Sequence, residues 1–91
     1  MGEVFIRIEV LPEAPETNME KVAEEVVKII EKQGGKVINY KIEPFVFGLK
    51  KLIIVFMYPE QEFNEEKLIE EIQKVGGVQS AEVTEVTRNV F

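Results

Sequence analysis

An uninterrupted apolar run in the second half of the chain restricts the fold more than any other feature. Residues 52–58 read Leu-Ile-Ile-Val-Phe-Met-Tyr, with no polar residue among them. A strand that is apolar at consecutive positions usually has both faces covered, unless one face is exposed for a functional reason. The run therefore predicts a strand at the centre of a sheet.

The residues just before this run form a corner. Residues 44–51 read Pro-Phe-Val-Phe-Gly-Leu-Lys-Lys, and Gly48 stands where a hairpin must turn. Beside it, Phe47 is a large apolar side chain at a position where polar residues are the usual choice. The corner therefore predicts a contact surface, with an aromatic that packs on its own hairpin as the common alternative.

The first half of the chain predicts a strand followed by a helix. Residues 4–11 alternate between apolar and mixed positions, which is typical of a strand with one face on the core. After two prolines, Thr17 and Glu20 have the spacing of a capping box, with the Thr17 hydroxyl at the helix start. Gly34-Gly35 ends the helix. Its buried stripe comprises Met19, Val22, Ala23, Val26, Ile29 and Ile30.

The second half repeats this order. Residues 36–43 alternate as a half-buried edge strand, and the central strand follows the corner. Asn64 is expected to cap a second helix, with Phe63 and Leu68 at the spacing of a hydrophobic staple and Gly-Gly at its end. A last strand spans 78 to about 88, and its apolar positions change parity near the end, which predicts a bulge or a change of exposed face.

Strand, helix, strand, repeated once, predicts an α+β fold. Two such units form a ferredoxin-like βαββαβ sandwich, with a four-stranded antiparallel sheet in the order 4-1-3-2 and both helices on one face. At 91 residues we expect one domain, residues 1–91. The other sheet face stays open. Candidates for that open face are Phe5, Arg7, Glu9, Asn39 and Lys41.

The composition argues against several kinds of chemistry. The chain has no Cys, His or Asp, and all 17 acidic residues are Glu. Thiolate nucleophiles, the usual zinc ligands and the commonest proton carrier are therefore missing, and Ser80 is the only serine. We expect no metal, no cofactor and no bond-making or bond-breaking active site. The abundance of Glu and Lys also suggests a thermophilic source.

The charge and the hydropathy limit the partners. The net charge of −6, from 11 basic against 17 acidic residues, argues against direct binding of nucleic acid. A basic protein partner fits better, although charge that serves solubility alone is the common alternative. No apolar run approaches the roughly 18 residues of a membrane span, and the first residues do not resemble a signal peptide. A cytoplasmic protein is expected.

The predicted fold alone does not select a function. Residues 48–53 fit the RNA-recognition consensus poorly, metal carriers of this fold rely on cysteines, and residues 12–16 are acidic where an acylphosphatase-like loop needs Arg. A ligand-sensing or assembly module remains open, because its pockets carry no fixed short motif.

Three segments carry a family resemblance. Residues 16–20 (ETNME), 47–52 (FGLKKL) and 78–83 (VQSAEV) together resemble the nucleotide-exchange domain of translation elongation factor 1-beta, in its short archaeal form. The resemblance extends over nearly the whole chain. It implies a guanine nucleotide exchange factor that promotes GDP release from elongation factor 1-alpha, the GTPase that brings aminoacyl-tRNA to the ribosome.

The resemblance also implies partner-binding residues. The family's corner Phe, which presses on the GTPase beside its switch region, falls on Phe47, and Gly48, Lys50 and Lys51 belong to the same segment. For the two lysines, solvated strand-entry residues are the alternative. A family Lys that enters the partner's magnesium site corresponds to Arg88, which keeps the charge but has a planar, wider head.

Overall fold

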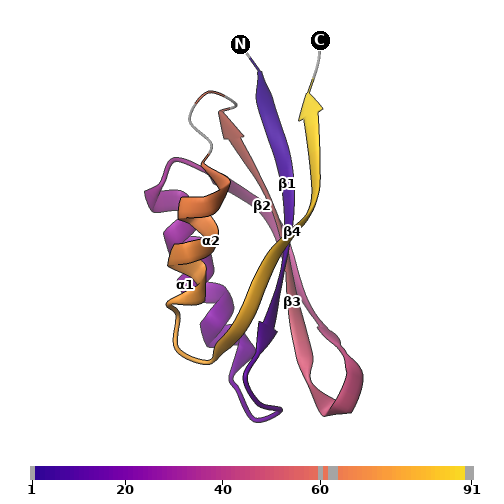
Figure 1. The fold of residues 1–91 in the computed structure, drawn as a ribbon. Helices are drawn as coiled ribbons and strands as arrows, with labels where there is room; N and C mark the ends of the chain where they lie inside the picture. The colour runs from indigo at the N-terminus through magenta and orange to yellow at the C-terminus, as the bar shows by residue number, and fades with distance from the viewer. Residues whose placement is uncertain (1, 60, 62–63, 90–91) are drawn as a thin grey trace.

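The computed structural model describes residues 2–59, 61 and 64–89, and of residues 88 and 89 it describes the backbone only. Strands β1 and β2 and the helix between them come first (Figure 1). A short turn then leads into β3, followed by the second helix and the last strand. The elements are β1 (Glu3–Pro12), α1 (Met19–Lys32), β2 (Lys36–Pro44), the turn Val46–Gly48, β3 (Lys50–Pro59), α2 (Glu65–Gln73) and β4 (Val78–Asn89).

The four strands form one antiparallel sheet in the order β2-β3-β1-β4. Both helices lie on the same side of it, and none of the described elements covers the other side (Figure 1). This is the ferredoxin-like order 4-1-3-2 counted from the opposite edge, so the predicted fold is confirmed. Among the described helices, none is long and apolar enough to cross a membrane.

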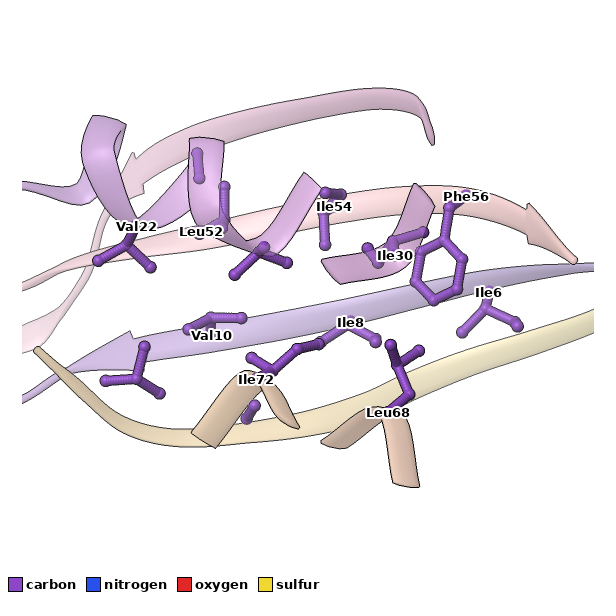
Figure 2. Close-up of a cluster of buried hydrophobic side chains, with 14 of the residues drawn as sticks. Ile6, Ile8, Val10, Val22, Ile30, Leu52, Ile54, Phe56, Leu68 and Ile72 are labelled. Atoms are coloured by element: carbon purple, nitrogen blue, oxygen red, sulfur yellow. The ribbon is translucent and has the colours of Figure 1, made fainter. Parts of the chain in front are cut away.

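The core lies between the helices and one face of the sheet. Alternate residues of β1 face the helices, and their Cα partners in β3 do the same. Figure 2 shows these strand side chains meeting Ile30 of α1 and Leu68 and Ile72 of α2. Burying a side chain of this size contributes about 1.5 to 3 kcal/mol. The strand residues of this layer with the lowest exposure are Ile6, Ile8, Val10, Leu52, Ile54 and Phe56.

The other face of β3 is also largely apolar. Ile53 pairs with Glu9 on one side and Lys41 on the other, so it lies on the open face, yet it is only 4% exposed. Long neighbouring side chains can cover apolar surface in this way. The register also places Arg7, Val55 and Asn39 in one row, which confirms the expected composition of the open face.

One predicted helix cap is wrong and the other is confirmed. The helix α1 is capped by Asn18, whose Oδ1 accepts a hydrogen bond from the Lys21 N–H at 3.2 Å, and not by Thr17. Asn and Thr are both competent caps. Thr17 instead lies against Gly77, where an added Cβ would stand 2.8 Å from its methyl group.

At the start of α2, Asn64 Oδ1 accepts from the Lys67 N–H at 3.0 Å, as predicted. The staple predicted for Phe63 lies outside the described residues.

The predicted irregularity in β4 is a bulge. Arg7 pairs with Glu85 and Ile8 pairs with Val83, which leaves Thr84 as the extra residue. Its hydroxyl donates to the Arg7 carbonyl oxygen at 3.2 Å. Beyond the bulge Val86 is 46% exposed.

Candidate partner-binding site

The corner, residues 45–49, connects β2 to β3 through an unusual backbone. The Phe45 N–H donates to the Leu49 carbonyl at 2.7 Å, and the Leu49 N–H donates to the Val46 carbonyl at 3.1 Å. Phe47 and Gly48 both have positive φ, 57° and 76°. Glycine adopts this conformation without steric cost, whereas for another residue it lowers the stability of the fold by roughly 1 to 2 kcal/mol. The turn predicted at Gly48 is confirmed. In this turn Phe47 adopts a left-handed backbone conformation that is unfavourable for a residue other than glycine.

The side chains of the corner are apolar and exposed. Phe47 is 91% exposed, and its neighbours Phe45 and Val46 are 39% and 52% exposed. The prediction that Phe47 is solvent-accessible is therefore confirmed. Its ring gains almost nothing from burial within the chain, and a cluster of exposed apolar side chains is typical of a contact surface.

The two lysines that follow differ in their surroundings. Lys50 is exposed and pairs with Pro44 at the end of the ladder. The next residue, Lys51, points to the open face with its Nζ 3.2 Å from Glu9 Oε1 and 5.2 Å from the centroid of the Phe45 ring. Lys51 thus makes its contacts within the molecule, with Glu9 of β1 and with the first aromatic ring of the corner.

Glu9 contacts this site through Lys51, although the sequence placed it only on the open face. Its side chain is 20% exposed and also accepts from Arg7 Nη1 at 2.8 Å. The alternation of residues 4–11 gave its face, but its pairing with Lys51 depends on the register between β1 and β3. The sequence contained no separate signal for that register.

Arg88 lies far from the corner. Its backbone pairs with Val4 in β1, near the end of the sheet where the described chain begins and ends, whereas the hairpin from β2 to β3 is at the opposite end (Figure 1). Val4 in turn pairs with Tyr58. At about 3.3 Å per residue, the stretch of β3 from Lys50 to Tyr58 is roughly 26 Å long. The structure therefore brings Phe47, Gly48, Lys50 and Lys51 together, and places Arg88 apart.

Grooves on the surface occur elsewhere. Two of them lie between α1 and α2, with Ile29 and Glu71 in the lining of both, and neither includes a residue of the corner. Within the described part of the chain, no group of three or more acidic side chains is placed to hold a metal ion. The corner, where Phe47 is 91% exposed, is a protruding surface.

Solved structures identify the class of fold. The ACT domain from the GTP pyrophosphokinase of Chlorobium tepidum superposes with a TM-score of 0.61 at 15% identity, covering 89% of this chain and 97% of that one. The C-terminal domain of the MgtC protein from Mycobacterium tuberculosis gives 0.61 at 14% identity, covering 91% and 85%. At this identity the likeness concerns the fold alone.

Sequence comparison identifies the family. The model of the EF-1 guanine nucleotide exchange domain matches residues 5–88. Elongation factor 1-beta of Nanoarchaeum equitans is 38% identical over 89% of this chain and 99% of its own length, and that of Metallosphaera sedula is 37% identical over the full length of both. The chain belongs to the EF-1 guanine nucleotide exchange domain family, which confirms the resemblance seen in its sequence.

Proposed function

We propose that this chain, as one domain of residues 1–91, promotes GDP release from the translational GTPase elongation factor 1-alpha and so supports translation elongation in the cytoplasm. The observation that carries the proposal is Phe47. It is 91% exposed in a left-handed backbone, so it costs the fold about 1 to 2 kcal/mol. Burying such a ring in a partner would contribute about 1.5 to 3 kcal/mol. Its place in an exchange-factor family supports the GTPase as that partner.

The proposed contact has two parts. Phe47 and Arg88 are separated by most of the length of the sheet, so a single small pocket of the GTPase cannot hold both. This separation supports a factor that lies along its partner, with Arg88 directed at the magnesium and phosphate site and the corner at a second region. Gly48, Lys50 and Lys51 shape the corner end of the contact.

Exchange in this proposal is a coupling between two binding equilibria. Magnesium bridges the nucleotide phosphates to the GTPase, so a competing cation and a displaced protein segment both weaken GDP binding. The factor binds the nucleotide-free GTPase more tightly than the GDP-bound form, and by reciprocity the nucleotide expels the factor by the same ratio. No bond in the nucleotide breaks, and neither a cofactor nor direct contact with nucleic acid is required.

The test is release of a fluorescent GDP analogue from the cognate elongation factor 1-alpha. Adding this chain should accelerate release in a saturable way, with an excess of unlabelled GDP present to prevent rebinding. No acceleration at any concentration would refute the proposal and leave a ligand-sensing or assembly module, the other class that this fold accommodates.

The part assigned to Arg88 has a test of its own. Because Arg and Lys share a charge but not a shape, Arg88→Lys should keep much of the exchange activity and Arg88→Ala should lose most of it. If the cation competes with magnesium, the advantage of the original chain over Arg88→Ala should shrink in excess chelator. Full activity of Arg88→Ala would remove this residue from the site.

A further inference from the structure

A chain of polar contacts crosses the open face and ends at the corner. It begins at the bulge of β4, where the Thr84 hydroxyl donates to the Arg7 carbonyl at 3.2 Å. The Arg7 side chain, through Nη1, donates to Thr84 Oγ1 at 3.0 Å and to Glu9 Oε2 at 2.8 Å. The bulge therefore fixes the Arg7 guanidinium, and the guanidinium holds one oxygen of Glu9.

The second oxygen of Glu9 continues the chain. Glu9 Oε1 accepts from Lys51 Nζ at 3.2 Å, and the same ammonium lies 5.2 Å from the centroid of the Phe45 ring. The side chains of Glu9 and Lys51 are only 20% and 21% exposed. Ion pairs this shielded from water are weakened less by solvent and salt than exposed pairs are. The contacts thus join β4, β1 and β3 to the first aromatic residue of the corner.

We propose that Glu9 is a positioning residue for the exchange contact, acting through Lys51 on the Phe45 ring and so on the orientation of Phe47. The inference rests on the proposed function, in which the corner touches the GTPase, but Glu9 itself does not touch the partner. The corner spans residues 45–49 between two strand ends, and the Phe45 N–H closes it by donating to the Leu49 carbonyl at 2.7 Å. The Phe45 ring that Lys51 contacts therefore belongs to one end of the loop that carries Phe47. A contact surface held in one orientation binds with a smaller loss of conformational entropy.

The first experiment needs no partner. Glu9→Gln keeps the shape of the side chain and removes its charge, so it should release Lys51 and loosen the corner. Amide hydrogen exchange measured by NMR should become about fivefold faster at the Phe45 and Leu49 N–H groups, a change of the size usual for coupled neighbours.

Glu70→Gln is the charge-matched control. Glu43 would not serve, because it is the cross-strand partner of Lys51. Glu70 lies on α2, on the other side of the sheet from Glu9, in an exposed ion pair with Lys74 at 3.9 Å. Amide exchange in the corner should therefore stay unchanged in this variant, and an equal acceleration in both variants would overturn the proposal.

A double-mutant cycle tests whether Glu9 acts on the corner through Lys51. If Glu9 acts through Lys51, then Glu9→Gln combined with Lys51→Gln should loosen the corner no more than Lys51→Gln alone. Additive effects would mean that Glu9 reaches the corner in another way, which contradicts the proposal. The Lys51 variant also provides an answer should Glu9→Gln fail to fold.

GDP release links the positioning to exchange. The kcat/KM of stimulated release should fall about fivefold in Glu9→Gln, mainly through KM, because a loosened corner still contains Phe47. Glu70→Gln should not change it. Unchanged release in Glu9→Gln, with the corner loosened, would overturn the positioning role.

Phe47→Ala distinguishes failure of the positioning role of Glu9 from failure of the proposed corner contact. If this variant loses exchange while Glu9→Gln keeps both corner protection and release, the positioning proposal fails and the proposed contact stands. If Phe47→Ala keeps full exchange, the corner contact itself fails, and with it any role of Glu9 in exchange.

Discussion

Two phenylalanines of the same hairpin have opposite environments. Phe56 is fully buried, with its ring edge-on to Tyr58 at a centroid distance of 5.9 Å, and lies beside Ile6 and Ile30 (Figure 2). Phe47 is 91% exposed at the corner that leads into the same strand. The first side chain stabilises the sheet against the helices, while the second contributes little to folding. Core stability and the corner part of the proposed recognition are thus located at different ends of one hairpin.

The largest effect on the unfolding free energy is expected at the buried ring of Phe56. Phe56→Ala removes a ring from the centre of the core, and such truncations cost about 3 to 5 kcal/mol. Domains of this size have roughly 5 to 15 kcal/mol of stability in total, so the variant should be severely destabilised. Urea unfolding followed by circular dichroism measures the change. A loss below about 1 kcal/mol would mean that the core closes around the gap, which would contradict the close packing of the Phe56 ring against its neighbours.

A smaller effect is expected where the backbone approaches the core. A Cβ added at Gly35 would stand 2.7 Å from Ile30 Cγ2 and 2.7 Å from Tyr58 Cε2. Gly35→Ala should therefore cost about 1 to 3 kcal/mol, as overpacking usually does. Gly76→Ala is the control, because nothing lies within 4 Å of its added Cβ. Equal unfolding free energies for the two variants would contradict the predicted close approach.

The smallest effect on stability, and one of opposite sign, is expected at the corner. Asn accepts a left-handed backbone more readily than Phe does. Phe47→Asn should leave the unfolding free energy unchanged or raise it by up to about 1 kcal/mol. The same urea experiment measures it beside Phe56→Ala. A loss of more than about 1 kcal/mol would show that Phe47 supports the fold, and the comparison between the two rings would break down.

Hydropathy patterns along the chain were sufficient to predict the sheet. The consecutive apolar residues of β3 predicted a central strand, and the parity change in β4 predicted the bulge that the structure places at Thr84. The predicted helix start was wrong by one residue. Thr17 and Asn18 are both competent caps, and in the structure Asn18 caps the helix while Thr17 lies against Gly77.

The sequence predicted the exposed residue of the candidate site but not its contacts across the strands. Exposure at Phe47 followed from a large apolar residue beside a turn glycine. The link from Glu9 to Lys51 joins strands far apart in sequence, and alternation gives the face of a residue without its partner across the strands. The separation of Phe47 from Arg88 was already implicit in the strand order, because the hairpin from β2 to β3 and the end of β4 lie at opposite ends of such a sheet.

The central claim is that the exposed corner drives exchange without supporting the fold. The most direct measurement is kcat/KM for stimulated GDP release from elongation factor 1-alpha by Phe47→Ala, with its unfolding free energy determined on the same preparation. We predict at least about a tenfold loss of exchange, as for an aromatic hot spot, with stability unchanged. Full exchange activity in a folded Phe47→Ala variant would contradict the claim.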